Sequence, residues 1–385
     1  MNNHDTRISA LTREQLDTLV RRLQGKKAAL GASGAADGNA NRKRQFCRER
    51  DCNFRLDIAK PGIIDSLRYR VCAKEAPPPG CVEVEVRSAS LNFRDVMLAL
   101  GLYPNAFNAS LQMGSDCAGT VVAIGENVSA VEIGDEVMCM TQGGFSAYAL
   151  ANAEAVMRKP PGLTWEQAAG IPVVFLTAYY GLHYLGRLSR GERVLVHCAT
   201  GGLGLAALQV AKLAEAEVFA TAGTEQKRAY LRSIGIQRVM DSRSLAFADE
   251  LLEITKGDGV DVILNCLPGE AIKKGLEILR PYGRFIEVGK RDLAENHDLG
   301  LLPFLKGISF SAVEFGFMRE VCPELLKRLC SEVQAYFDNG TFKPLPSRVY
   351  SLSEASKAFA HMAEGKHIGK IVLAVQDEPI LVEPA

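Results

Sequence analysis

The chain has 385 residues, and its 45 basic side chains balance its 45 acidic ones. This balance offers no bulk attraction to nucleic acid or to an anionic membrane, so neither is expected as a partner. No run reaches the roughly eighteen apolar residues of a membrane span, the polar N-terminus is unlike a secretory signal, and the ten cysteines form no C-x-x-C pair. The composition, 47% hydrophobic and 23% charged, predicts a cytoplasmic globular protein of about two or three domains.

The first 53 residues differ from the rest of the chain. Leucine and valine recur at helical spacing in residues 12–24, and a segment rich in glycine and alanine follows at 31–40. We predict an amphipathic helix that a flexible linker joins to the remainder. This helix is either a tail without a catalytic role or a docking segment for another protein.

From residue 54 the pattern changes to short strands and turns. Residues 81–87 alternate apolar and polar side chains, which is typical of a half-buried strand, and glycine-containing turns follow at short intervals. The chain also ends in a late apolar run at 369–375. We predict a β-rich domain made of residues 54–180 and 315–385, with residues 181–314 forming a second domain between them.

A glycine-rich turn lies at the start of that second domain. The apolar run 193–197 precedes it, an alanine-rich helical stretch 205–214 follows, and another strand comes at 216–221. Strand, glycine turn, helix and strand are the context in which G-x-G-x-x-G binds a dinucleotide, although Ala199 replaces the first glycine here. The turn predicts pyrophosphate contacts at the helix N-terminus. The residues expected to make them are Thr200, Gly201, Gly202, Leu203 and Gly204.

The end of the second strand indicates which nicotinamide cofactor binds. NAD-specific units place an acidic residue there to hold the ribose 2′-hydroxyl, whereas this strand runs into Thr221 and Thr224 without one. Lys227 and Arg243 follow at positions where they could make charge-assisted contacts to a 2′-phosphate. We therefore assign all four residues to the cofactor site and predict NADPH. Further strands at 260–265 and 283–289 complete a doubly wound parallel sheet of the α/β class.

Several motifs resemble one enzyme family. They are LNFRDVMLALGLYP from residue 91, GSDCAG from 114, ATGGLG from 199, FIEVGKRD from 285 and HIGKIV from 367. In this order they resemble the enoyl reductases of type I polyketide synthases and animal fatty acid synthase, which are medium-chain dehydrogenases/reductases. The resemblance covers about residues 54–376. It implies a Rossmann domain inserted into a GroES-like β-rich domain, and NADPH-dependent reduction of the C=C bond of an α,β-unsaturated acyl thioester on an acyl carrier protein.

The same resemblance places the chain in the zinc-free branch of that superfamily. Phe93 stands where the zinc alcohol dehydrogenases have a cysteine ligand, and Cys139 stands alone where they have a four-cysteine lobe. We therefore expect no metal. The N-terminal helix and linker are similar to inter-domain segments of such synthases, so contact with other synthase modules is one expectation for them.

Three residues are candidates for catalysis by this resemblance. Tyr103 matches the family tyrosine linked to proton delivery at Cα, and Lys290 matches a second proposed donor. The family pairs that lysine with an aspartate, but Gly316 falls at the corresponding place. Glu314 is two residues earlier, a step that on a strand would keep the same face, so either it replaces the aspartate or the pair is not needed.

Other residues match positions that line the cofactor in the family. They are Asn92, Asp95, Thr177, Asn265, Leu267, Gly289 and Lys370. Two other functions stay open: a quinone or free-enone oxidoreductase of the same superfamily, and a non-catalytic protein that binds NADPH. The sequence leaves open the acyl chain length, branching at Cα, a ring-closing outcome and the oligomeric state.

Overall fold

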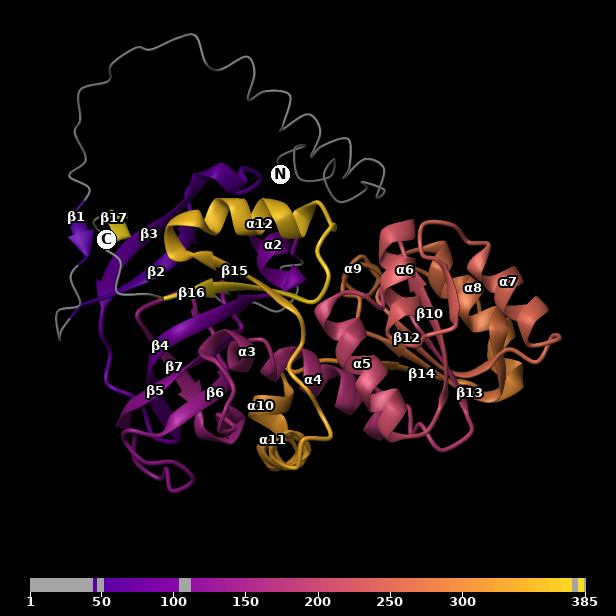
Figure 1. Cartoon of the computed structure of the whole chain (residues 1–385), viewed down its shortest axis with the longest axis horizontal. Coiled ribbons are helices and arrows are strands. Elements are labelled where there is room, and N and C mark those ends of the chain that lie inside the picture. Colours follow the sequence, from indigo (N-terminus) through magenta and orange to yellow (C-terminus); the bar gives the residue numbers. More distant parts are fainter. Residues whose placement is uncertain (1–43, 47–51, 104–111, 376–379, 384–385) are drawn as a thin grey trace, which may run out of the picture.

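The computed structural model describes residues 44–46, 52–103, 112–375 and 380–383, which form two lobes side by side (Figure 1). The expected helix at 12–24 and its linker lie outside the described residues, so both stay predictions. Within the described part of the chain, no helix is long and apolar enough to cross a membrane.

One lobe is built on a six-stranded, all-parallel sheet. Its strand order is β11-β10-β9-β12-β13-β14, the doubly wound order in which strands are added first on one side of β9 and then, from β12 on, on its other side. This confirms the predicted α/β class. The strands are β9 (Arg193–Val196), β10 (Glu217–Ala222), β11 (Arg238–Asp241), β12 (Val260–Asn265), β13 (Leu279–Glu287) and β14 (Ser309–Ala312). The helices between them are α5 (Gly202–Leu213), α6 (Glu225–Ser233), α7 (Phe247–Ile254), α8 (Glu270–Ile278) and α9 (Arg291–Ala294).

The other lobe is β-rich, as expected of a GroES-like domain. Its larger sheet has the order β15-β16-β4-β5-β6-β8, with β7 also pairing with β4, and its smaller sheet has the order β1-β17-β3-β2. The larger sheet comprises β4 (Cys81–Leu91), β5 (Asp116–Ile124), β6 (Glu136–Met140), β7 (Tyr148–Asn152), β8 (Val156–Arg158), β15 (Ser347–Ser351) and β16 (Lys370–Ala374). The smaller comprises β1 (Arg44–Phe46), β2 (Cys52–Ile58), β3 (Leu67–Ala73) and β17 (Ile380–Glu383).

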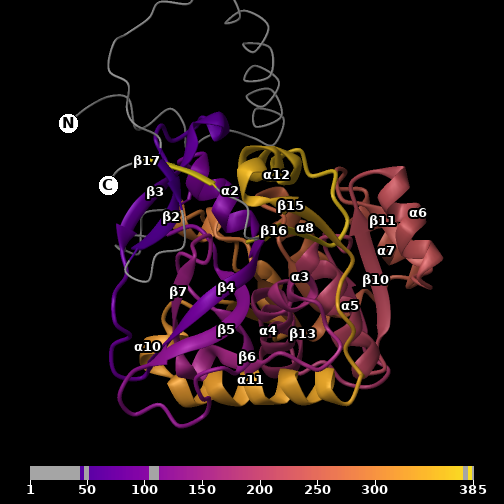
Figure 2. The ribbon, with the colours of Figure 1, turned by 60° about the vertical axis from the view of Figure 1, so that its left-hand side comes forward.

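Long-range contacts hold the β-rich lobe together and join it to the parallel-sheet lobe. β16 pairs antiparallel with β4, so the late apolar run rejoins the β-rich lobe as predicted. The remaining helices are α2 (Phe93–Ala99), α3 (Trp165–Ala169), α4 (Pro172–Tyr179), α10 (Met318–Val321), α11 (Pro323–Asp338) and α12 (Ala355–Ala363), and a π-helix spans Tyr180–Leu185. α11 runs along the edge of the molecule beneath α4 in Figure 2. Phe175 of α4 packs edge-on against Phe337 of α11, with ring centroids 4.8 Å apart, so one hydrophobic core continues from α4 and α5 into α11.

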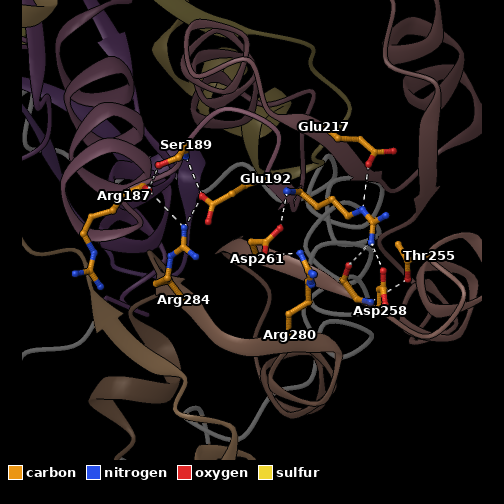
Figure 3. Close-up of polar contacts among 11 residues, drawn as sticks. Arg187, Ser189, Glu192, Glu217, Thr255, Asp258, Asp261, Arg280 and Arg284 are labelled. Carbon is orange, nitrogen blue, oxygen red and sulfur yellow. Dashed lines mark hydrogen bonds and ion pairs between the residues drawn. The ribbon is translucent and has the colours of Figure 1, made fainter.

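A cluster of ion pairs holds the starts of the parallel strands together (Figure 3). Asp261 accepts from the backbone N–H of Arg193 at 2.8 Å and pairs with Arg280 at 2.9 Å. Arg284 pairs with Glu192 at 2.6 Å. Because these residues lie at or near the N-terminal ends of strands, the cluster is at the opposite end of the sheet from the glycine turn. We assign it a structural role.

Candidate active site

The glycine turn connects β9 to α5 at the carboxyl end of the parallel sheet. Gly201 is the N-cap of α5, and Gly202 begins the helix. A Cβ atom on Gly204 would lie 2.4 Å from Cα of Ala199, so the helix can approach the turn this closely only because Gly204 has no side chain. The helix N-terminus supplies backbone N–H groups and a positive dipole end, which together suit a pyrophosphate.

Alanine substitutions at two of these glycines should therefore separate folding from cofactor binding. Gly204→Ala is expected to destabilise the protein by about 1–3 kcal/mol, because a backbone atom blocks the new methyl group. A Cβ on Gly201 would meet only the carbonyl oxygen of Cys198 at 3.5 Å, so Gly201→Ala should fold normally and bind the dinucleotide less tightly. Thermal melts and cofactor titrations check both effects. Equal melting temperatures for the two variants would contradict this account.

The end of β10 carries the residues assigned to the ribose phosphate. Thr224 caps α6 and accepts a hydrogen bond from the backbone N–H of Lys227 at 3.3 Å. The side chain of Arg243 is exposed and lies beside the turn, since a Cβ on Gly223 would be 3.0 Å from its Nε. Thr221 is different because it is fully buried, and its hydroxyl contacts Nδ1 of His197 at 3.0 Å. Thr221 therefore supports the turn from inside, and we remove it from the cofactor contacts.

Lys370 lies at the centre of a buried polar network between the lobes. Its ammonium donates to the carbonyl oxygen of Leu91 at 3.0 Å and to Oδ1 of Asn92 at 2.9 Å, and it forms an ion pair with Asp116 at 3.4 Å. Burial lowers the pKa of Lys370, and the nearby carboxylate of Asp116 counteracts this shift. Asp116 also accepts from Ser90, from Nδ2 of Asn92 and from the backbone N–H of Val173.

This network includes three of the residues predicted to line the cofactor. Asn92 and Lys370 bind each other and Asp116, so their polar atoms hold the turn between β4 and α2. Asp95 is fully buried and accepts from the backbone N–H groups of Asn92 and Gly114, both at 2.8 Å. These hydrogen bonds position all three side chains, and their contact with the cofactor stays a prediction. Asp116, their shared partner, was missed from the sequence because only the fold shows that it is buried against Lys370.

The predicted lysine and glutamate meet at the ends of β13 and β14. The ammonium of Lys290 pairs with Glu314 at 2.7 Å and also donates to the carbonyl oxygen of Val313. The second carboxylate oxygen of Glu314 accepts from the backbone N–H of Gly316 at 2.7 Å. Glu314 therefore occupies the place of an acidic partner for Lys290, which is one of the two alternatives that the sequence left open.

Tyr103, although distant in sequence, lies within electrostatic range of Glu314. Burial raises the pKa of Tyr103, the cation of Arg94 lowers it, and the anion of Glu314 raises it. The guanidinium of Arg94 lies 5.6 Å from the centre of the tyrosine ring. The phenol consequently stays protonated at neutral pH and can serve as a proton donor. Of the sequence-predicted residues, the structure thus pairs Lys290 with Glu314 and places Tyr103 within electrostatic range of that carboxylate.

A buried glutamate that the sequence did not reveal connects the ends of β12 and β13. Glu287 accepts hydrogen bonds from Nδ2 of Asn265 at 2.6 Å and from the backbone N–H of Gly289. Burial raises the pKa of Glu287 to about 8. Asn265 also donates to the carbonyl oxygen of Leu267 at 2.7 Å. The side chain of Asn265 therefore shapes the two turns, and Leu267, which is 4% exposed, packs in the core.

The remaining predicted site residues lie in α4, in the glycine turn and at the start of α5. Thr177 lies in α4 and is 6% exposed. Thr200 and Leu203 belong to the glycine turn and the start of α5. Within the described residues, no three His, Cys, Asp or Glu side chains are close enough to hold a metal ion. Metal analysis of the purified protein would test the expectation that none is bound.

Comparisons with known proteins identify the family. The profile of the alcohol dehydrogenase GroES-like domain matches residues 78–161, and that of a zinc-binding dehydrogenase matches 234–373. The chain is 43% identical over 321 residues to a phenolphthiocerol/phthiocerol polyketide synthase of Mycobacterium tuberculosis (strain ATCC 25618 / H37Rv). This match covers 83% of the chain and 15% of the synthase, so the chain spans about a seventh of that relative's length.

Two solved structures agree with this match. The CurK enoyl reductase is 38% identical with a TM-score of 0.77, and the match covers 84% of this chain and 99% of that one. The CurF ER cyclopropanase from the curacin A biosynthetic pathway is 35% identical with a TM-score of 0.77, at the same coverage of both chains. The chain therefore belongs to the polyketide synthase type of enoyl reductase, oxidoreductases of the medium-chain dehydrogenase/reductase superfamily.

Proposed function

We propose that the protein uses NADPH to reduce the C=C bond of an α,β-unsaturated acyl thioester carried by an acyl carrier protein. The observation that supports this proposal is the Lys290–Glu314 ion pair, with Tyr103 within electrostatic range of Glu314, because conjugate reduction needs a cation and a proton donor near the reacting atoms. The glycine turn lies at the same carboxyl end of the parallel sheet. Homologues in the superfamily bind NAD(P)H, and the choice of NADPH rests on Thr224, Lys227 and Arg243.

The residues present fit such a cofactor. Gly201 leaves room for a pyrophosphate at the N-terminus of α5, while Gly202 and Gly204 let Lys370 and Ala199 pack closely against the turn. Bound NADPH would supply the hydride that adds to Cβ of the enoyl group. The ammonium of Lys290 stabilises the negative charge that then develops on the thioester oxygen, and Glu314 keeps that ammonium in place. The phenol of Tyr103 delivers a proton to one face of Cα.

The substrate carrier and the setting of the protein are part of the same proposal. The M. tuberculosis relative is named a polyketide synthase, and a synthase presents its intermediates as thioesters, which supports an acyl carrier protein as partner. Other synthase modules would contact the helix predicted at 12–24. A cytoplasmic location fits this setting.

Incubation of the protein with crotonyl-pantetheine thioester or crotonyl-carrier protein tests the proposal. We expect NADPH oxidation and a product two mass units heavier, with little turnover of a quinone or a free enone. Faster turnover of the quinone would favour the first alternative function. NADPH binding without turnover of any acceptor would favour a non-catalytic role. A substrate with a γ-leaving group distinguishes plain reduction from the ring closure that the name of the CurF relative indicates.

Substitution of Tyr103 by valine should change stereochemistry more than rate. The enolate is basic enough to take a proton from water or from Lys290, so NADPH oxidation is expected to stay within about tenfold of wild type. With an α-methyl enoyl thioester, the configuration at Cα should change or become mixed, which chiral analysis of the product measures. Complete loss of NADPH oxidation would show that Tyr103 does more than deliver a proton. An unchanged configuration would remove it from the mechanism.

A further inference from the structure

Arg94 lies in the first turn of α2, directly before the buried Asp95. A cation is unfavourable at this end of a helix, because the helix dipole is positive there, so helix stability does not explain an arginine at this position. Residues that precede β5 hold its guanidinium instead. Nη1 of Arg94 donates to Oγ of Ser115 at 2.7 Å and to the carbonyl oxygen of Gln112 at 3.4 Å. These contacts fix the cation beside the start of the helix.

The guanidinium that is fixed in this way faces the phenol of Tyr103. Its central carbon lies 5.6 Å from the centroid of the phenol ring, which is within the range of a cation–π contact. Tyr103 follows the end of α2, and its backbone N–H donates to the carbonyl oxygen of Met97 at 3.2 Å. The helix and the turn after it therefore bring the two side chains together on the β-rich lobe, where Figure 1 shows α2.

The charged groups that act on the phenol differ in sign. Burial raises the pKa of Tyr103, and the charge and a hydrogen bond of Arg94 lower it. The carboxylates of Glu314 and Asp95 raise it. Among these three groups Arg94 alone is a cation. A phenol that gives up its proton becomes an anion, and without Arg94 this anion would face two carboxylates at a half-buried position.

We propose that Arg94 is a positioning residue for proton delivery, which holds the phenol of Tyr103 in place and compensates the charge left on its oxygen after the proton has passed to Cα of the substrate. This inference rests on the proposed reduction of an enoyl thioester. In that step the O–H bond of Tyr103 breaks as a C–H bond forms at Cα, and the electron pair of the O–H bond stays on the phenol oxygen. Water then returns a proton to the phenol. A cation held in place beforehand stabilises the phenolate without reorganisation.

A titration of the phenol tests this role without any turnover. In the full chain, 3-fluorotyrosine, which is more acidic than tyrosine, replaces Tyr103, and its ionisation is followed by fluorine NMR between about pH 7 and 10. With Arg94→Met added, the fluorophenol should ionise at a higher pH, because the cation is lost while both carboxylates remain. Arg94→Lys keeps the charge but loses the planar fork, so its midpoint should lie between these two.

Two further variants separate this role from a general effect of substitution. Ser115→Ala removes the anchor of the guanidinium at 2.7 Å but leaves its charge, so it should raise the midpoint less than Arg94→Met does. Arg87→Met removes an arginine that pairs with Glu85 on β4, and it should leave the midpoint unchanged. Equal midpoints with and without Arg94 would overturn the proposal, as would a rise of the same size in Arg87→Met.

The configuration of the product gives a second readout. With an α-methyl enoyl thioester, Arg94→Met should mix the configuration at Cα as Tyr103→Val does, while the cofactor Kd stays within about twofold of wild type. The double variant should give no more mixing than Tyr103→Val alone, because Arg94 acts through the phenol, and further mixing would contradict this. Reduction with equal fluorine midpoints would refute the role of Arg94 alone, whereas a raised midpoint without any reduction would refute the proposed reaction.

Discussion

Replacing Lys290 with methionine is expected to lower kcat for enoyl thioester reduction by about two to four orders of magnitude. The ammonium is held by Glu314 and by the carbonyl oxygen of Val313, so it is fixed before a substrate arrives. A cation positioned in this way can stabilise the enolate oxygen without reorganisation. Methionine keeps the length of the side chain and removes only the charge and its donors. Stopped-flow measurement of NADPH oxidation gives kcat, and a separate titration gives the cofactor Kd.

Substitution of Glu314, the partner of Lys290, should lower kcat less than substitution of Lys290 itself. Glu314→Gln keeps an oxygen that can accept from the backbone N–H of Gly316, but it loses the ion pair. We expect a smaller fall in kcat than for Lys290→Met, with the Kd for NADPH unchanged in both variants. Lys273→Met, at an exposed pair on α8, is the matched control and should retain wild-type activity. A Lys290→Met variant with kcat within about threefold of wild type would exclude Lys290 from the chemistry.

Substitution of Asp116 by alanine is expected to have the largest effect on stability. Asp116 is fully buried, and the side chain of Lys370 beside it is only 3% exposed. Removing one partner of a buried pair leaves the other charge uncompensated, which costs about 3–5 kcal/mol. Ser90, Asn92 and Val173 would lose an acceptor at the same time. Urea denaturation followed by circular dichroism measures the change in the free energy of unfolding.

A double substitution shows whether loss of the Asp116–Lys370 pair itself causes the loss of stability. The double variant Asp116→Ala/Lys370→Met removes both charges, so it should be more stable than Asp116→Ala alone. The exposed pair Arg190–Glu215, with side chains 81% and 62% exposed, is the control, and its removal should change stability by less than about 1 kcal/mol. If the double variant lost as much stability as the sum of the losses in Asp116→Ala and Lys370→Met, the coupling between Asp116 and Lys370 would be contradicted.

Local pattern was sufficient for the class of fold and for the glycine turn. Strand periodicity, Gly201 and Gly204, and the alanine-rich start of α5 depend on neighbours within a few residues, so they are readable in order along the chain. Family resemblance added Tyr103 and Lys290, which no local rule connects. The same resemblance placed Asn92, Asp95 and Lys370 at the cofactor, but it did not show that Asn92 and Lys370 bind Asp116 or that Asp95 accepts from the backbone of Asn92.

Tertiary structure alone decided which polar groups are buried and what they face. Whether Glu314 could replace an aspartate depended on the distance between the ends of β13 and β14, which is set by their pairing in the sheet. Thr221 and Thr224 look equivalent in the sequence, yet one hydroxyl is buried against His197 and the other caps α6. In the same way, no local sequence pattern distinguishes Asp116, Glu287 and His367 from other polar residues. Burial and neighbours more than a hundred residues away, such as Lys370 for Asp116 and Lys227 for His367, determine their chemistry, because desolvation and charge act through space.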